Sequence, residues 1–442
     1  MKHVVIIGNG ISGITAARHI RKASNFKITV ISAESEHFWS RTALMYIYMG
    51  HMKYEHTKPY EDWFWKKNKI ELMHDYVSSI NFKEKKLRLA KGENISYDSL
   101  VLATGSKPNK FNWPGQDAKG VCTMVSLQDL ENIQKYTTNI SKAVVVGGGL
   151  IGVEMAEMLH SKSIKTTFLV REEKFWRNTL PYQEADLVGR HISKHQIDLR
   201  LSTELKEIVT DDREQVKAVI TSSGETIECE FVGITTGVHP NIELVKDSAL
   251  STNKGILVNQ FLQTNIPDVY AIGDCAEQIE PIANRPSIEQ VWYTGKIMGE
   301  TVAQTICRSP KAYQPGPWYN SAKFFDIEYQ TYGHVPHIAQ PHENRFYWEH
   351  PSGNKAMHFC FHHKTNAFLG VNTFGIRLRH NLLDSWLRKP TSIQQVIENL
   401  KAANFDPEFF ASYEKEITEQ FNQQYPELKV KPHKRKRIAG IF

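Results

Sequence analysis

The sequence predicts an α/β protein built from two parallel-sheet units, with a separate α+β domain at its C-terminal end. Three observations support this fold class. The chain opens with an apolar strand, a glycine-rich turn and a helix, and the same order returns about 140 residues later. From about Tyr313 the pattern changes to aromatic, strand-like stretches, followed by helical ones from Thr391 onward.

Length and composition indicate a multidomain protein without a membrane span. A chain of 442 residues is too long for one ordinary core. Its apolar runs fall short of the roughly 18 to 20 residues that a spanning helix needs. The N-terminal sequence MKHVVIIGNG passes from an apolar stretch directly into glycines, which is typical of a first strand rather than a signal peptide. We therefore expect a cytoplasmic protein.

Charge and cysteine content exclude several classes of function. The net charge of +6 is modest and part of it lies in the basic tail Lys429–Arg437, so we expect no nucleic-acid binding. The five cysteines form no C-x-x-C pair, which argues against a disulfide framework and against a local redox dithiol.

Two strand–turn–helix–strand units carry the main motifs. In each unit the turn reads G-x-G-x-x-G. We expect the four parts at 4–7, 8–13, 14–22 and 27–32, and again at 143–146, 147–152, 153–161 and 166–170. A G-x-G-x-x-G turn has meaning in this context, because it follows a strand, opens a helix and lies in a unit of about 30 residues.

The spacing of the glycines matches the requirements of a dinucleotide. The first glycine permits the tight turn, the second lets the backbone approach the pyrophosphate, and the third lets the helix pack on the strand. The phosphates then lie at the positive N-terminus of the helix. Two Rossmann-like dinucleotide-binding domains are thus expected, with binding positions Gly8, Asn9, Gly10, Ile11, Ser12 and Gly13 in the first and Gly147, Gly149, Leu150, Ile151 and Gly152 in the second.

Acidic residues complete the first site. Glu34 stands about 20 residues beyond Gly13, where a carboxylate accepts the adenosine ribose hydroxyls, and Glu36 is the competing candidate. A later strand delivers Gly273 and Asp274 at its carboxyl end, where an aspartate can hydrogen-bond a polyol.

Two echoing segments indicate where the chain crosses between domains. Residues 104–109 and 236–241 both read Thr-Gly, two residues, Pro-Asn. We expect the first dinucleotide-binding domain to consist of two parts, 1–115 and 245–312, with the second dinucleotide-binding domain inserted at 116–244 and the α+β domain at 313–442.

The ordered motifs resemble the pyridine nucleotide–disulfide oxidoreductase superfamily over roughly Lys2 to Ile306. The four motifs are Gly8 to Gly13, Ala103-Thr104-Gly105, Gly147 to Glu154 and Val269 to Asp274. The resemblance implies that FAD is held by the first, second and fourth, with Asp274 on the ribityl chain, and that a nicotinamide nucleotide is held by the third. It adds Arg41, Val77, Gly237 and Trp292 as expected cofactor contacts, Trp292 near the flavin pyrimidine.

One region separates the chain from the disulfide reductases of the superfamily. Those enzymes carry a redox cysteine in the region that here runs from Phe38 to Gly50, which contains none. The region looks more like that of the rubredoxin and ferredoxin reductases and of the flavin module of assimilatory nitrite reductases. In such relatives a lysine often pairs with the glutamate of the second fingerprint near flavin N5. Tyr46 holds that position here, so the resemblance gives Glu154 and Tyr46 as catalytic candidates.

The choice of nucleotide depends on the end of the second unit's last strand. An acidic residue there selects NADH, and an arginine accepts the 2′-phosphate of NADPH. Arg171 and Arg177 form a spaced pair suited to a phosphate, whereas Glu172 could meet a free ribose. We favour NADPH on this pattern.

Two further patterns are assigned ordinary roles. His358, Cys360 and His362 alternate along a strand, but without a fourth ligand they indicate a sheet face rather than a metal site. The basic tail suits a peripheral membrane contact or an acidic carrier protein, and a solvated chain end is the competing interpretation.

These features predict an FAD-dependent NAD(P)H:acceptor oxidoreductase. Hydride passes from the nicotinamide to flavin N5, and electrons then pass to a carrier of the ferredoxin or rubredoxin kind. The alternatives are a membrane-peripheral NADH:quinone reductase and a redox-sensing flavoprotein similar to apoptosis-inducing factor. We expect a homodimer or a monomer, with the C-terminal domain deciding the acceptor.

Overall fold

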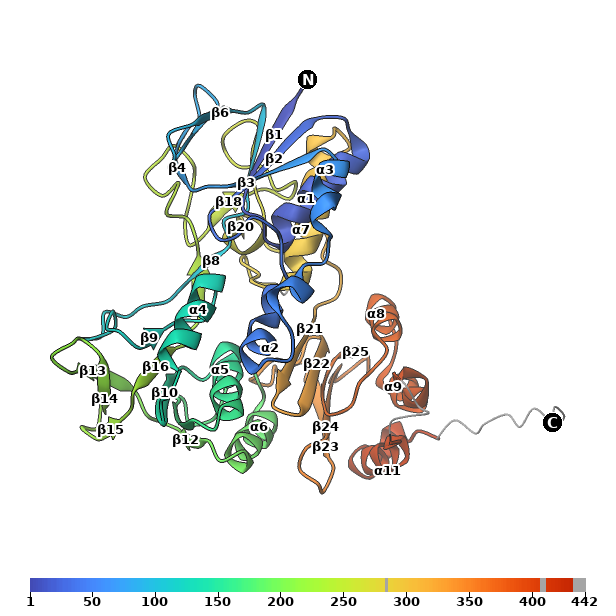
Figure 1. Ribbon diagram of the computed structural model, residues 1–442. Coiled ribbons are helices and arrows are strands. Elements are labelled where there is room, and N and C mark those ends of the chain that lie inside the picture. The colour runs from blue at the N-terminus through green and yellow to red at the C-terminus, as the bar shows by residue number, and fades with distance from the viewer. Residues whose placement is uncertain (283–284, 406–410, 432–442) are drawn as a thin grey trace, which may run out of the picture. The chain divides into compact units, whose positions relative to one another are not determined.

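The structure is a computed structural model that describes residues 1–282, 285–405 and 411–431 (Figure 1). The chain forms two compact units. The first contains Met1–Leu169 and Glu204–Pro315, and the second contains Val170–Thr203 and the chain from Gly316 onward. Each unit is therefore assembled from two separated stretches of sequence. The basic tail beyond Lys431 lies outside the described residues.

The first unit begins with a parallel sheet in the strand order β19-β7-β1-β2-β3, of which Figure 1 labels β1, β2 and β3. Its strands are β1 (His3–Ile7), β2 (Lys27–Ser32), β3 (Ile70–His74), β7 (Ser99–Leu102) and β19 (Val269–Ala271). Ile6 of β1 pairs with Val30 on one side and with Val101 on the other. All three are buried, as expected for central strands covered on both faces.

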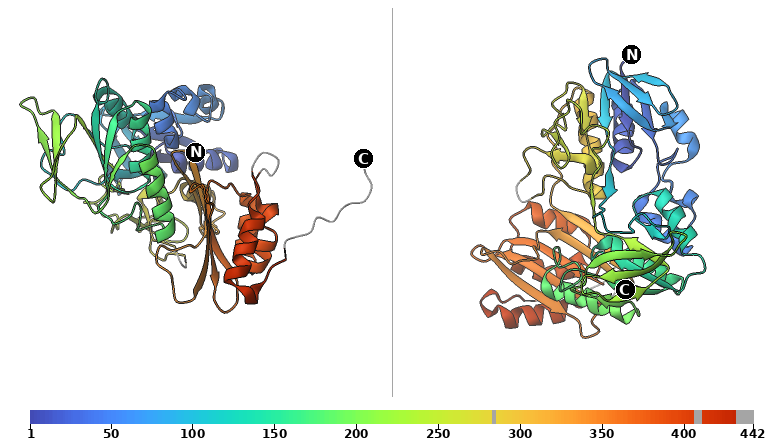
Figure 2. Two further views of the ribbon diagram at one scale, coloured as in Figure 1. Left: turned by 90° about the horizontal axis from the view of Figure 1, so that it is seen from below. Right: turned by 90° about the vertical axis from the view of Figure 1, so that its left-hand side faces the viewer.

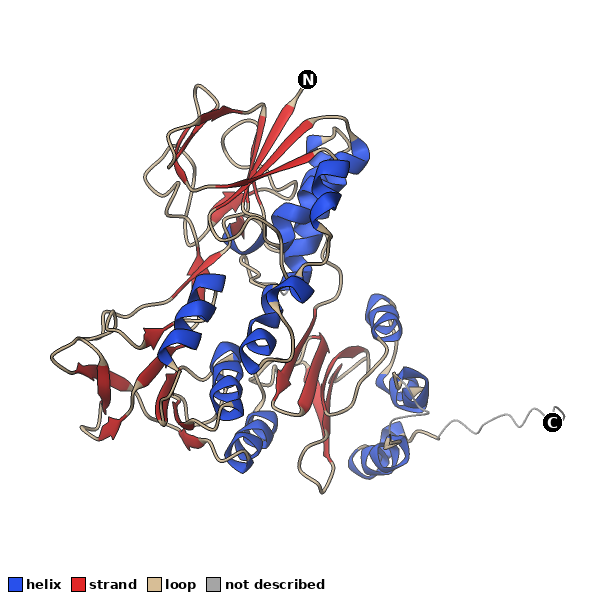
Figure 3. Cartoon of the chain, viewed as in Figure 1, coloured by secondary structure: helices blue, strands red, loops and turns tan. Residues whose placement is uncertain are grey.

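Helices α1 (Ile11–Ala23) and α7 (Trp292–Ile306) pack against each other beside this sheet (Figure 3). Gly299 of α7 allows the close approach, because an added Cβ would lie only 2.5 Å from the carbonyl oxygen of Ser12. Two short helices, α2 (Leu44–Met49) and α3 (Asp62–Lys67), follow β2, and a small antiparallel sheet contains β4 (Val77–Asn81), β5 (Lys86–Leu89) and β6 (Asn94–Ser96).

A second parallel arrangement repeats the strand–helix–strand order. The first unit contributes strands in the order β11-β10-β16-β9, with α5 after β10. The elements are β9 (Val121–Cys122), α4 (Leu127–Tyr136), β10 (Lys142–Val146), α5 (Leu150–Ser161), β11 (Lys165–Leu169) and β16 (Phe231–Ile234), with an antiparallel meander of β13 (Leu205–Thr210), β14 (Val216–Thr221) and β15 (Thr226–Glu228). The predicted pair of Rossmann-like sheets is confirmed.

The two echoing segments pair with each other. They form the antiparallel strands β8 (Ser106–Pro108) and β17 (Val238–Pro240). The hydroxyl of Thr104 donates to the carbonyl of Asn241 at 2.7 Å, which fixes their relative register. A further short pair, β18 (Ile256–Val258) and β20 (Ala276–Gln278), lies near the end of this unit's sequence.

The second unit contains an antiparallel sheet in the order β21-β22-β25-β24-β23, which confirms the predicted α+β domain (Figure 3). The strands are β21 (Tyr319–Phe324), β22 (Ile327–Gly333), β23 (Glu343–Glu349), β24 (Ala356–His362) and β25 (Phe368–Phe374). The helical elements are α6 (Tyr182–Lys194), α8 (His380–Arg388), α9 (Ile393–Glu398), α10 (Leu400–Ala403) and α11 (Glu414–Gln424), and β12 (Asp198–Arg200) is a short strand.

Side-chain alternation places helices on both faces of this sheet. Phe359 and Val371 belong to a buried cluster with Phe421 of α11. Their neighbours in sequence, His358 and Asn372, point to the other face and contact α6. The left view of Figure 2 shows the sheet between green α6 and the red C-terminal helices.

Among the described residues, no helix combines the length and the apolar character that crossing a bilayer requires.

Candidate functional site

In the first glycine turn, the two end glycines have no room for a side chain, whereas the middle one does. We call such a turn closed at its ends and open in its middle. Gly8 has a φ of 111°, and a Cβ there would overlap the carbonyl oxygen of Ala103. A Cβ on Gly13 would overlap the carbonyl oxygen of Gly8. A Cβ on Gly10 would meet nothing within 4 Å. The turn thus leaves space at the one position where the backbone must approach a pyrophosphate.

The second glycine turn repeats this geometry. A Cβ on Gly147 would lie 2.6 Å from the carbonyl oxygen of Thr235, and one on Gly152 would overlap the carbonyl oxygen of Gly147. Gly149 again has nothing within 4 Å. Both turns therefore fit a bound dinucleotide by the same construction.

Each open glycine caps the helix that follows it. Helix α1 begins at Ile11 and α5 begins at Leu150, and neither N-cap glycine has a side chain to occupy the first N–H groups. Those groups have no partner within a helix, so they are available to phosphate oxygens at its positive end. Ile151 follows in the first turn of α5.

Two polar residues of the first turn have structural partners. The side chain of Asn9 donates to the carbonyl of Ser35 at 2.8 Å, which ties the turn to the loop after β2. The hydroxyl of Ser12 lies against Gly273 and Gly295, where added Cβ atoms would meet it.

Glu34 and Arg41 form a pair in the structure. Arg41 Nη1 donates to Glu34 Oε1 at 2.9 Å, and Nη2 donates to Oε2 at 2.5 Å. Glu34 Oε1 also accepts from the backbone N–H of Leu127, at the start of α4, at 3.0 Å. A ribose hydroxyl at Glu34 would therefore share the carboxylate with Arg41 and with this helix.

Asp274 is a partly buried carboxylate of the first unit. Burial raises the pKa of Asp274, and a hydrogen bond from Ser106 opposes that shift. The Ser106 hydroxyl donates to Asp274 Oδ2 at 2.8 Å, and Gln290 Nε2 donates to the same hydroxyl at 2.9 Å. Gly273, with a φ of 73°, sets the turn that presents this carboxylate.

The remaining expected contacts of FAD lie in different settings. Val77 is buried at the start of β4, and Trp292 is 37 % exposed at the start of α7. The segment Ala103, Thr104 and Gly105 follows β7 and is tied to the echoing segment, since the carbonyl of Gly105 accepts from Asn241 N–H at 2.9 Å. Gly237, with a φ of 89°, accepts from Asn109 N–H at 3.0 Å.

Glu154 and Tyr46 have distinct surroundings. Burial raises the pKa of the Glu154 carboxyl to about 7, and the neighbouring Glu157 carboxylate acts in the same direction. The ring of Tyr46 stacks on His51, with ring centroids 6.1 Å apart. Helices α2 and α5, which carry the two candidates, contact each other.

Arg171 and Arg177 both lie in the second unit and have different partners. Arg171 is largely exposed and donates to Glu172 Oε1 at 3.1 Å, so the two competing selectors of the nucleotide pair with each other. Arg177 Nη1 donates to the carbonyl of His337 at 3.1 Å.

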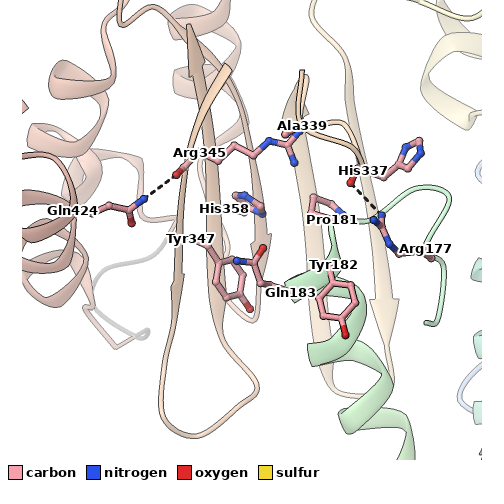
Figure 4. A pocket seen from close by; sticks show the side chains of 10 residues that line it. All are labelled: Arg177, Pro181, Tyr182, Gln183, His337, Ala339, Arg345, Tyr347, His358 and Gln424. Carbon is pink, nitrogen blue, oxygen red and sulfur yellow. Dashed lines mark hydrogen bonds between the residues drawn. The ribbon is translucent and has the colours of Figure 1, made fainter. Parts of the chain in front are cut away.

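Arg177 also lines a cavity of about 360 Å³ within the second unit (Figure 4). Its walls come from the loop before α6, the start of α6, the loop between β22 and β23, the strands β23 and β24, and α11. Its lining residues are Arg177, Pro181, Tyr182, Gln183, His337, Ala339, Arg345, Tyr347, His358 and Gln424.

The cysteines are free, and their surroundings disfavour thiolate chemistry. Cys122, Cys229, Cys275 and Cys360 are buried, and Cys307 is partly so. Burial raises the pKa of Cys122, Cys229 and Cys360 to about 12 and raises those of the other two. Reactive cysteines have lowered pKa values instead.

Ser35, Ser106 and Gln290 are residues that sequence reasoning did not select. Each supports an expected site residue through a contact between segments far apart in sequence, and no short motif marks such a contact. A serine directly after the Ala-Thr-Gly motif is the one available signal for Ser106.

Comparison with known protein families gives a match over most of the chain. The family model described as "Pyridine nucleotide-disulphide oxidoreductase" matches residues 2–293. A nitrite reductase [NAD(P)H] of Bacillus subtilis is 31% identical over 62% of this chain and 34% of its own length. An assimilatory nitrate reductase electron transfer subunit of the same species is 25% identical over 88% of this chain and 49% of its own length. This chain thus spans a third to a half of these two relatives.

An archaeal relative and two solved structures extend the comparison. An NADH oxidase of Methanocaldococcus jannaschii is 32% identical over 68% of this chain and 69% of its own length. A ferredoxin reductase from Rhodopseudomonas palustris, 24% identical, superposes with a TM-score of 0.78 over 85% of this chain and 91% of that one. An NAD-dependent persulfide reductase from A. fulgidus, 23% identical, gives 0.84 over 96% and 83%. These two structures show the shared fold.

Proposed function

Because this chain belongs to the pyridine nucleotide-disulphide oxidoreductase family, we propose that it is an FAD-dependent NAD(P)H oxidoreductase that passes electrons to a separate carrier. The observation that carries the proposal is the pair of glycine turns, each closed at its ends and open at Gly10 or Gly149. One open turn would bind a single dinucleotide. Two open turns within one unit provide one site for the nicotinamide nucleotide, which donates the hydride, and one for FAD, which accepts it.

We assign FAD to the first turn and the nicotinamide nucleotide to the second. The first turn shares its sheet with β7 and β19, whose ends present Thr104 and Asp274 for the flavin side of a dinucleotide. When bound, FAD accepts a hydride from the nicotinamide and supplies the electrons to the acceptor. The chain's own part is to bind, orient and exclude water.

Glu154 is the ionisable group that we place near the flavin. A carboxyl with a pKa of about 7 can hold or release a proton at neutral pH, whereas an ordinary glutamate stays ionised. Glu154 can therefore adjust the local charge when the redox state of its surroundings changes. Tyr46, on the neighbouring helix α2, is proposed to fill the space of the lysine found in relatives.

Electrons leave this protein without a thiol intermediate in our proposal. The five cysteines are buried or partly buried and have raised pKa values, so none suits the exchange of a disulfide. This supports a carrier as acceptor. The names of the relatives, a nitrite reductase and an electron transfer subunit of nitrate reductase, fit the same direction of electron flow.

For the donor we favour NADPH, on the strength of the exposed guanidinium of Arg171 directly after β11. For the acceptor we propose an acidic one-electron carrier of the iron–sulfur or rubredoxin kind, met in the cytoplasm. A basic tail would attract such a protein at low ionic strength.

The test is an anaerobic titration of the purified flavoprotein with NADH and with NADPH, following the loss of flavin absorbance. Rapid bleaching by a nicotinamide nucleotide is expected, faster with NADPH, and Arg171→Glu should reverse the preference without loss of flavin. A protein that contains no flavin, or whose flavin neither nucleotide reduces, would refute the proposal. Bleaching at equal rates by both nucleotides would refute only the assignment of Arg171.

A further inference from the structure

Three metal-ligating side chains meet in the second unit, separate from the glycine turns. They are His191 of α6, His195 directly after α6, and Asp326 in the turn between β21 and β22. His191 Nε2 lies 2.6 Å from Asp326 Oδ1, His195 Nε2 lies 3.1 Å from the same oxygen, and the two Nε2 atoms are 3.3 Å apart. Among the described residues, this is the group of three that could hold a metal ion.

With Asp326 ionised, no placement of hydrogens on the two Nε2 atoms makes all three contacts favourable. If both histidines carry hydrogen on Nε2, each can donate to the ionised Asp326, but the two N–H groups then face each other across 3.3 Å. If one Nε2 lacks hydrogen and accepts from the other, its lone pair faces the carboxylate oxygen. Every placement of these hydrogens therefore leaves at least one of the three contacts repulsive. A cation between the three atoms would make all of them favourable.

The distances suit a tetrahedral ion. Ligand atoms about 2.0 to 2.1 Å from zinc at the tetrahedral angle lie about 3.3 to 3.4 Å from one another. Two of the three observed separations, 3.3 and 3.1 Å, are close to this. The third, 2.6 Å, has the length of a hydrogen bond and would widen by about 0.7 Å.

We propose that His191, His195 and Asp326 bind one divalent transition-metal ion of the zinc type, with water as the fourth ligand. His191 lies in the last turn of α6 and His195 follows it four residues later, directly after the helix, which is the spacing of the two zinc-binding histidines in H-E-x-x-H helices. Two imidazoles and one carboxylate form a mixed N and O donor set that favours such ions over calcium or magnesium. The proposal does not depend on the flavin chemistry.

The surroundings hold the ligands in place and leave a path for the ion. The ring of His195 stacks on Phe325, with centroids 4.3 Å apart and planes 9° apart. The side chain of His191 is only 6% exposed, so the surrounding packing restricts its movement. Asp326, 65% exposed, opens the site to solvent. An ion bound here would join α6 to the β21–β22 turn.

The test is equilibrium dialysis of the chelator-treated flavoprotein against Zn²⁺, with metal content measured by mass spectrometry. We expect one Zn²⁺ per chain and a rise in the thermal unfolding midpoint, because the ion binds the folded state. His195→Gln and Asp326→Asn should each weaken binding at least tenfold. Flavin content and circular dichroism check that each variant is folded.

A matched control removes a histidine elsewhere in the second unit. His363 is exposed and its ring stacks on that of His362. Removing it tests whether zinc binds to histidines of this unit in general. His363→Ala should keep both the stoichiometry and the midpoint shift. The proposal is wrong if no stoichiometric Zn²⁺ binds, if both His195→Gln and Asp326→Asn bind it as tightly as the natural chain, or if His363→Ala abolishes binding.

Discussion

At the scale of single residues, Glu154 links burial to pH dependence. Its pKa of about 7 in the folded chain lies above the ordinary glutamate value of 4.5. Below about pH 4.5 the carboxyl is protonated in both states, so its burial costs nothing through ionisation. Between about pH 4.5 and 7 the folded state holds a proton that the unfolded state releases, so stability falls as pH rises. Above about pH 7 the carboxyl is ionised in both states, and the folded state bears the full cost of burying its charge.

Glu154→Gln should therefore stabilise the protein at high pH and not at low pH. The shift corresponds to at most about 3 to 4 kcal/mol above pH 7, at about 1.4 kcal/mol per pH unit. Denaturant unfolding of the natural chain and of the variant at about pH 5 and about pH 8 measures the difference. Glu131→Gln, at an exposed position in α4, is the control and should show no such gap. A constant difference between Glu154→Gln and the natural chain would contradict the prediction.

Residues differ in how far the sequence determines them. Gly8 and Gly13 could be predicted, because the spacing of the G-x-G-x-x-G motif marks them locally, even though the backbone that Gly8 meets, at Ala103, is distant in sequence. The pairing of Glu34 with Arg41 and Leu127 N–H could not, since Leu127 belongs to a helix about 90 residues further along. The same holds for Ser106 and Asp274, which only the tertiary fold brings together.

At the scale of elements, the two glycine turns permit a matched experiment. Gly10 has an extended backbone with φ −66° and Gly149 has φ −113°, so alanine is sterically allowed at both. In each turn the added methyl would project into the open space that we assign to a pyrophosphate. The substitutions should therefore affect ligands and not folding.

Gly10→Ala should lose FAD, and Gly149→Ala should keep FAD but bind the nicotinamide nucleotide about tenfold more weakly, a change of about 1.4 kcal/mol. Flavin content on purification and a nucleotide titration measure the two effects. Gly8→Ala, which would overlap Ala103, should instead lower the yield of folded protein. If Gly10→Ala retains full flavin and Gly149→Ala is the variant that loses it, our assignment of the turns is reversed.

Elements with a strong local pattern could be predicted from sequence, and their partners could not. Both glycine turns lie between the predicted strands and helices. The antiparallel sheet of the second unit was expected only as strand-like stretches, because nothing local fixes the order β21-β22-β25-β24-β23. The spacing of His191 and His195 was a readable signal, but Asp326 lies about 130 residues away in sequence.

At the scale of the whole molecule, neither unit is a continuous piece of chain. The segment Val170–Thr203 follows a strand of the first unit, yet it belongs to the compact unit that contains the C-terminal sheet. No local pattern announces this grouping. Glu184 of α6 links this segment to the C-terminal sheet. Its carboxylate is fully buried, contacts His358 of β24 at 2.8 Å and accepts from the side chain of Asn372 of β25 at 2.8 Å.

This network should make the second unit sensitive to His358. His358→Ala removes one of the two side-chain partners of a buried carboxylate, which costs about 1 to 3 kcal/mol, and more when the stranded group is charged. We expect a lower free energy of unfolding with flavin content unchanged, measured by denaturant titration with circular dichroism. His342→Ala, at a histidine whose side chain is 53% exposed, is the matched control and should change little.

A second substitution separates a stranded charge from a simple loss of packing. Adding Glu184→Gln to His358→Ala removes the negative charge that has lost its partner, so the double variant should recover part of the lost stability. If the charge is the cause, the two effects are strongly non-additive, as expected for residues in contact. If the double variant is less stable than His358→Ala alone, the cost comes from the cavity left by the imidazole, and the Glu184 contact does not stabilise the junction of the two chain segments.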